Sequence, residues 1–143
     1  MTLTIRPVDI NYISQTWPLI KPFIEEALAK GGDFPDWAWG YNIDHIQGYV
    51  TSGQWLLLAA VDEENTIHGA CTVSFINYPL HRIAFVTAIG GKLISNRDTF
   101  EQLKLLMKQR GATKIQGYGR ESIVRLWKRY NFEPRNTLVE VLL

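Results

Sequence analysis

The chain has 143 residues, 46% hydrophobic and 20% charged, a composition that excludes a disordered chain and fits one ordinary domain, residues 1–143. No apolar run approaches the roughly 20 residues that cross a bilayer, so we expect no membrane span. The net charge of +1 divides unevenly: residues 1–91 carry four basic and nine acidic residues, and residues 92–143 carry eleven and five. That asymmetry favours either an anionic partner near the C-terminal half or solvated helix faces.

The cysteine content and the N-terminal residues predict a cytoplasmic protein. Cys71, the single cysteine, cannot form an internal disulfide, which fits a reducing compartment. Because it lies in an apolar strand pattern, a small buried side chain is favoured over a catalytic thiol. Residues 1–7 lack the charged start and apolar stretch of a secretory signal.

The first third predicts a strand and two helical regions. Residues 2–8 alternate as a short edge strand, and residues 11–30 have helical spacing ended by two glycines. Pro18 and Pro22 predict a kink, or a helix that starts near Pro18. Residues 33–53 contain short helices opening at Pro35 and at 43–50. This segment is rich in aromatic residues, which either line a substrate mouth or cover the core: Phe34, Trp37, Trp39, Tyr41 and Tyr49.

The middle of the chain predicts three strands, followed by a helix. Residues 55–61 form an apolar run typical of a buried strand, 67–76 form its hairpin partner, and 82–89 form a third strand. Ser95 and Asp98 resemble a capping box that opens the helix, and Gly111 is placed to end it.

The last third predicts a strand over 113–119, a helix from about Glu121 and a final strand over 137–143. The helix is expected to end at Asn131, which tolerates a left-handed backbone. Its expected buried positions are Ile123, Val124, Trp127 and Tyr130.

This order of elements resembles the GNAT acetyltransferase fold over essentially the whole chain. GNAT proteins often carry Asn-x-x-Ala-x-x-Leu-Tyr-x-x-x-Gly-Phe in the terminal helix. Ile123 here stands in the Ala place, Leu126 in the Leu place, Trp127 in the Tyr place, Asn131 in the Gly place and Phe132 in the Phe place. The resemblance implies an α/β domain whose central, mixed, mostly antiparallel sheet has about six strands flanked by helices.

The resemblance further implies acyl transfer from acetyl-CoA, or a related thioester, to an amine of a small molecule or a protein. In the family the tyrosine hydroxyl protonates the departing thiolate of coenzyme A. Trp127 offers only an indole N–H, which gives up no proton near neutral pH. Tyr130, one helical turn further on, is the candidate substitute.

The cofactor residues implied by the resemblance lie at the end of the fourth strand. The thioester carbonyl would meet main-chain amides of Thr87, Ala88 and Ile89, and the phosphates would meet Gly90, Gly91, Lys92 and Arg97. The family's pyrophosphate motif, Gln/Arg-x-x-Gly-x-Gly/Ala, is absent from this connection, and the nearest imitation, residues 116–121, precedes the other helix. The alternative interpretation is a simple turn before a capped helix, with Asp98 opposing an anion.

A second hypothesis is a catalytically inactive protein of this fold. The chain is loosely similar to small GNAT-like proteins of tailed bacteriophages, which implies a virion or assembly protein, an assembly partner, and a place in the host cytoplasm or the virion. Nucleic-acid binding is supported by charge alone. His45, His68 and His81 have no metal-ligand spacing, so no metal is expected.

Overall fold

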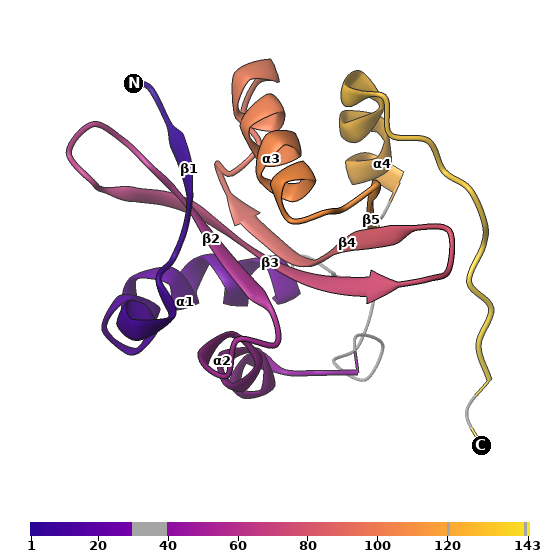
Figure 1. Cartoon of the computed structure of the whole chain (residues 1–143), viewed down its shortest axis with the longest axis horizontal. Helices are drawn as coiled ribbons and strands as arrows, with labels where there is room; N and C mark the ends of the chain where they lie inside the picture. Colours follow the sequence, from indigo (N-terminus) through magenta and orange to yellow (C-terminus); the bar gives the residue numbers. More distant parts are fainter. Residues whose placement is uncertain (30–39, 120, 142) are drawn as a thin grey trace.

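One five-stranded sheet forms the centre of the computed structural model, which describes residues 1–29, 40–119, 121–141 and 143 (Figure 1). The strands lie side by side in chain order: β1 (Thr4–Pro7), β2 (Leu56–Val61), β3 (Ile67–Asn77), β4 (Arg82–Gly91) and β5 (Lys114–Gly117). Neighbouring strands are antiparallel except β4 and β5, which are parallel. The predicted mixed, mostly antiparallel sheet is therefore confirmed, with five strands instead of about six.

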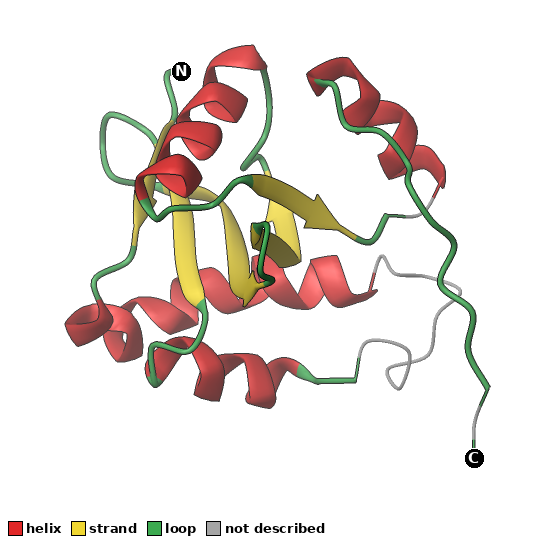
Figure 2. Ribbon diagram, turned by 45° about the vertical axis from the view of Figure 1, so that its right-hand side comes forward, coloured by secondary structure: helices red, strands yellow, loops and turns green. Residues whose placement is uncertain are grey.

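Helices cover both faces of this sheet (Figures 1 and 2). On one face lie α1 (Ile13–Ala29), which follows the short helix η1 (Ile10–Tyr12), and α2 (Ile43–Thr51). On the other lie α3 (Arg97–Gln109), α4 (Glu121–Trp127) and η3 (Lys128–Tyr130). Each face has its own buried apolar cluster, so the core has two layers. None of the described helices is both long and apolar enough to span a bilayer.

The first helix runs unbroken through both prolines, so the predicted start near Pro18 is wrong. Pro18 and Pro22 are exposed, while the buried side chains of α1 lie on its other face. Each proline removes one backbone donor, and the carbonyl that loses its partner faces water there. Burial of the apolar side chains of α1 thus outweighs the cost of the backbone hydrogen bonds lost at the two prolines. The aromatic residues at 34, 37 and 39 and the helix predicted at Pro35 lie outside the described residues.

The capping box of α3 is shifted from the predicted pair by one residue. Asn96, not Ser95, is the N-cap, and its partner is Thr99, not Asp98. The Asn96 side chain accepts from the Thr99 amide at 2.9 Å, and the Thr99 hydroxyl accepts from the Asn96 amide at 3.2 Å. The side chains of Ser, Asn, Asp and Thr can all accept hydrogen bonds from backbone amides. The sequence spacing therefore does not distinguish the Ser95–Asp98 pair from the Asn96–Thr99 pair.

The sixth strand, predicted over 137–143, does not form in the described part of this segment. Figure 1 shows the chain leaving α4 and running past the sheet to the C-terminus. Alternation of apolar residues gives a segment a strand preference, but a strand exists only where a neighbour completes its ladder. The missing neighbour explains the difference.

Candidate active site at the end of the β4–β5 pairing

A β-bulge interrupts β4 at Thr87. Thr72 of β3 pairs with Ala88, and the next residue, Val73, pairs with Val86, which leaves Thr87 as an extra residue. The bulge shifts the alternation of the strand: Ala84 and Val86 belong to the cluster beneath α3, whereas Ala88 belongs to the cluster against α1.

The parallel pairing of β4 with β5 ends next to the bulge at Thr87. Its last register pair is Val86 with Gly117, so residues 87–91 continue β4 with no described strand on the β5 side. A parallel strand pair that separates leaves backbone groups at a strand edge without a ladder partner. Three predicted cofactor-binding residues, Thr87, Ala88 and Ile89, lie along this edge.

Hydroxyl groups surround the bulge. The Thr87 hydroxyl lies 2.7 Å from that of buried Thr72 and donates to the Thr72 carbonyl at 3.0 Å. The Tyr41 hydroxyl donates to the Thr87 carbonyl at 2.7 Å. Burial raises the pKa of Tyr41 to about 12, and neighbouring Tyr118 adds to the shift. Tyr41 therefore stays protonated and keeps donating its hydrogen bond to the Thr87 carbonyl in the bulge.

Aromatic rings lie around the residues whose hydroxyls contact the bulge. Tyr41 meets Trp55 edge to face at 5.1 Å between centroids, and Trp55 stacks on Tyr49 at 4.5 Å. Tyr118, which directly follows β5, meets Phe85 of β4 edge to face at 5.1 Å. Tyr118 is 58% exposed, so a ligand can contact it.

The predicted phosphate-binding glycines have a packing role. A Cβ at Gly90 would overlap the main-chain carbonyl of Phe23 in α1, and one at Gly91 would lie 2.5 Å from the His68 carbonyl. Gly91 also has φ +66°, which disfavours other residues. Gly90 lets α1 cross β4 closely, whereas the His68 carbonyl and the left-handed backbone account for Gly91, so packing and conformation explain both glycines without a ligand.

Side chains already occupy several amides at the start of α3. The Ser95 and Asn96 amides donate to the Thr99 hydroxyl at 3.0 and 3.2 Å, and the Thr99 amide donates to Asn96. The Lys92 amide donates to the His68 carbonyl at 2.8 Å. Amides satisfied in this way do not form the cradle that binds a diphosphate at other helix N-termini.

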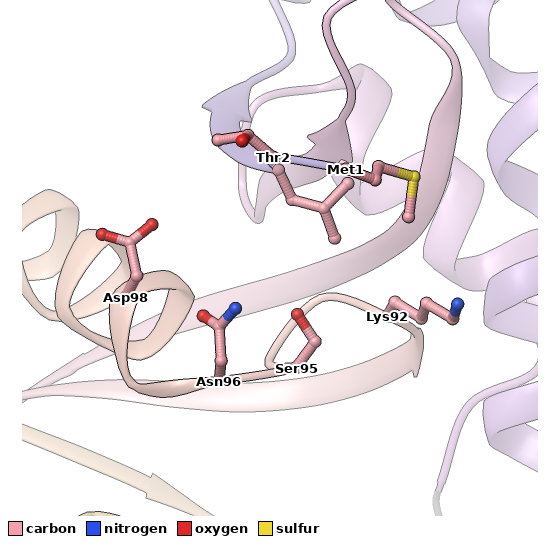
Figure 3. Close-up of a pocket in the computed structure, with 7 residues that line it drawn as sticks. Met1, Thr2, Lys92, Ser95, Asn96 and Asp98 are labelled. Carbon is pink, nitrogen blue, oxygen red and sulfur yellow. The ribbon is translucent and has the colours of Figure 1, made fainter.

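Lys92 lines a pocket of about 440 Å³ between the N-terminal residues and the start of α3 (Figure 3). Figure 3 shows Lys92 and Asp98 at opposite ends of it. The pocket also borders Met1–Leu3, which precede β1. It therefore lies towards the β1 edge of the sheet, and β5 forms the other edge. Lys92 is thus not brought to the bulge.

Arg97 and Tyr130 join α3 to the end of α4. The Arg97 guanidinium donates to the Arg129 carbonyl at 2.8 Å and lies 5.3 Å from the centre of the Tyr130 ring. Tyr130 stacks on Phe100 of α3 at 5.0 Å. The predicted phosphate-binding residue and the predicted proton donor therefore contact each other and tie α3 to the end of the last helix.

Trp127, in the position of the family's proton donor, is a packed core side chain. It is 9% exposed, and its ring lies against Gly117 and meets Phe132 at 5.1 Å between centroids. A Cβ at residue 117 would lie 3.5 Å from Cζ3 of this ring, an ordinary packing distance, so the ring lies directly over Gly117. Trp127 closes the α4 side of the place where β4 and β5 separate.

Sequence reasoning does not single out Tyr41 or Tyr118 as candidate site residues. Tyr41 belongs to the aromatic segment that either lines a substrate mouth or covers the core, and only the fold brings it to Thr87, 46 residues away. Tyr118 did carry a signal. It directly follows a strand parallel to β4, and ligands gather at the carboxyl ends of parallel strands.

No protein-family model and no curated protein matches this chain, but solved structures match it almost end to end. A predicted acetyltransferase from Clostridium acetobutylicum, solved with acetyl-CoA, is 18% identical, with a TM-score of 0.66 over 99% of this chain and 96% of its own. A GCN5-related N-acetyltransferase from Ralstonia eutropha JMP134 is 11% identical, with a TM-score of 0.66 over 99% of both chains. An aminoglycoside acetyltransferase from an uncultured soil metagenomic sample is 15% identical, with a TM-score of 0.66 over 100% of this chain and 99% of its own.

The chain has the GNAT fold. Identities this low establish the fold and leave the activity to the site itself. The described residues of this GNAT-like domain fit the acyl end of acetyl-CoA, because β4 has an open edge at the bulge. At the start of α3 the Ser95, Asn96 and Thr99 amides are already bonded to side chains, so these three are not free to hold a diphosphate.

Proposed function

We propose that the chain binds acetyl-CoA, or a related thioester, where β4 and β5 separate, and transfers its acyl group to an amine. One observation carries the proposal: the β4–β5 ladder ends at Val86 and Gly117, level with the bulge at Thr87. This leaves a strand edge, backed by hydroxyl groups, at which an extended ligand can make main-chain hydrogen bonds.

The chain's own residues divide the work in this proposal. Main-chain amides of residues 87–89 orient the acyl carbonyl, and Tyr41 fixes the bulge through the Thr87 carbonyl. The thioester would supply an activated acyl group. Tyr118 would hold the proton that a departing thiolate needs, since its exposed side chain directly follows β5 and neighbours Tyr41 at the bulge.

The assignment of the proton donor is tested with a matched pair of single-hydroxyl deletions. Release of free coenzyme A thiol is followed with acetyl-CoA and a panel of primary amines. Tyr118→Phe is expected to slow turnover about 100-fold, because general acids typically contribute that much or more. Tyr130→Phe should leave turnover within about twofold of the native rate, as its ring stacking on Phe100 survives. The reverse ranking would restore Tyr130 as the donor and contradict the assignment to Tyr118.

A non-catalytic module of the same fold is the second candidate. It is favoured by Trp127, whose packed ring occupies the usual donor place, and by Gly90 and Gly91, which close packing and backbone conformation explain. A virion or assembly partner would be the ligand in that case. Wild-type protein that releases no thiol with any amine, and binds no acetyl-CoA at millimolar concentration, would favour this candidate.

A further inference from the structure

A second pocket, of about 300 Å³, lies at the end of the sheet where β2 begins and β3 ends. Pockets that hold small ligands begin at about this volume. Because a water molecule occupies roughly 30 Å³ in the liquid, the pocket has room for a ligand of about ten non-hydrogen atoms. None of the described residues that line it is acidic, and the lining includes four apolar residues and two arginines: Val8, Trp55, Leu56, Phe75, Arg82 and Arg110.

The apolar part of the pocket wall comes from both layers of the core. Val8 and Trp55 pack on the cluster against α1, while Leu56 and Phe75 pack on the cluster beneath α3. All four side chains are half-buried and border the pocket, so they still have apolar surface to cover. Contact with the apolar body of a ligand would remove that surface from water, which is favourable.

The two arginines supply positive charge at the same place. Arg82 is the first residue of β4, and Arg110 is the C-cap of α3. The Arg82 side chain donates through Nε to the Arg110 carbonyl at 3.0 Å and through Nη1 to the Asn77 side-chain oxygen at 2.8 Å. Arg110 Nη1 donates to the Leu106 carbonyl at 3.4 Å. Both guanidiniums thus bond to neutral oxygens, and neither has a carboxylate partner in the described part of the chain.

The contacts of these arginines with the end of α3 leave most of their donors over. A guanidinium has five N–H donors, and the bonds above occupy two on Arg82 and one on Arg110. Arg82 is also held in position, since its guanidinium lies 4.4 Å from the centre of the Phe75 ring. Paired N–H groups of a guanidinium match the two oxygens of a carboxylate. Charge and apolar surface therefore meet in one pocket with complementary places for an acid and its apolar body.

We propose that this pocket binds a small carboxylate that carries an apolar aliphatic or aromatic body. Arg82 and Arg110 hold the carboxylate, and Leu56 and Phe75 cover the body. The arginines lie away from the bulge, because Arg82 precedes Thr87 by five residues, roughly 16 Å along an extended strand. The proposal is independent of acyl transfer.

The test is a titration of isotopically labelled protein with octanoate, followed by the amide chemical shifts in NMR spectra. Octanoate fits the pocket in size, and a Kd of about 1 mM or below is expected for a ligand of roughly ten non-hydrogen atoms. The shifted amides should include those of Leu56, Phe75 and Arg110. Shifts confined to amides outside the pocket would overturn the proposal.

Matched probes separate the contributions of charge and apolar body. Octanamide has the shape of octanoate without its charge and should bind at least about tenfold more weakly. Acetate has the charge without the apolar body and should not saturate. Phenylacetate is as large as octanoate, and the tighter of the two shows whether the body is aliphatic or aromatic. Failure of both to bind, or equal affinity for octanoate and octanamide, would overturn the proposal.

Arg110→Gln should raise the Kd for octanoate about tenfold, because a charge-assisted hydrogen bond is lost. The matched control is Lys108→Gln, which removes an exposed charge from the same helix outside the pocket lining and should change the Kd by less than about twofold. Arg82→Gln should weaken binding as well. Because Arg82 also bonds to Asn77 and to the Arg110 carbonyl, its urea midpoint is recorded alongside, and the Arg110 variant decides if the Arg82 variant unfolds. An unchanged Kd for Arg110→Gln would contradict the assignment.

Discussion

Tyr41 donates a 2.7 Å hydrogen bond to the carbonyl of Thr87, the one residue of β4 that the register with β3 leaves over. The bond links the segment before α2 to the bulge and leaves the neighbouring main chain of β4 in one fixed arrangement. A site that must orient a small carbonyl depends on such preorganisation.

Tyr41→Phe should lower the free energy of unfolding by about 1–2 kcal/mol, because the Thr87 carbonyl loses its donor in a partly buried place. The ring contact with Trp55 is kept. Urea denaturation measures the change, and Tyr78→Phe, at an exposed tyrosine, is the control with an expected change within about 0.5 kcal/mol. Equal effects of the two substitutions would contradict the importance of the bond.

Gly90→Ala should destabilise the fold by about 3 kcal/mol or more, because its methyl group would overlap main-chain atoms of Phe23 that cannot rotate away. Gly48→Ala is the matched control. Gly48 lies within α2 with nothing within 4 Å of an added Cβ, so alanine should stabilise by about 0.5–1 kcal/mol. Thermal or urea unfolding reports both. A well-tolerated alanine at residue 90 would return this glycine to the list of ligand-binding candidates.

Trp127→Ala should cost about 3–5 kcal/mol, the usual loss for a buried aromatic side chain. The adjacent Leu126 is 41% exposed, and Leu126→Ala should cost about 1 kcal/mol or less. Denaturant midpoints at equal slope compare the two. If the tryptophan variant loses no more stability than the leucine variant, Trp127 is not a core residue.

The pKa of the Asp62 carboxyl is lowered by three donors: His68 Nε2 at 2.8 Å, the Thr66 amide at 3.0 Å and the Glu64 amide at 2.8 Å. A lowered pKa in the folded state stabilises the protein above the ordinary carboxyl pKa of 3.8, and this contribution is lost as pH falls through the folded value. Asp62→Asn should therefore be less stable than the native chain near pH 6, with a difference that shrinks below about pH 4. Melting temperatures across this range measure it, and a pH-independent difference would contradict the assignment.

Local pattern was sufficient for most of the fold. The predicted strands at 55–61 and 67–76 and the predicted helical spacing of α3 each match the structure to within a residue or two. In these segments the same apolar residues determine both the type of element and its buried face. The left-handed Asn131, with φ 68°, ends the last helical turn as predicted.

The differences arise where the outcome depends on a distant neighbour. The bulge at Thr87 is set by how β4 meets β3 and α1, which no spacing within β4 encodes. Residues 137–143 have the pattern of a strand, but the pattern does not specify where its partner lies. The candidate site follows the same rule: Thr87 to Ile89 are predicted from a family resemblance, whereas Tyr41 comes from a segment with no motif.

Calorimetric titration with acetyl-CoA tests the central claim most directly. If the separation of β4 and β5 binds a thioester, the wild-type chain should bind one acetyl-CoA with a Kd in the micromolar range typical of enzyme substrates. Tyr118→Phe should bind with an unchanged Kd, since its hydroxyl is assigned to proton transfer and not to affinity. The absence of saturable heat at millimolar acetyl-CoA, with the protein folded, would contradict the claim.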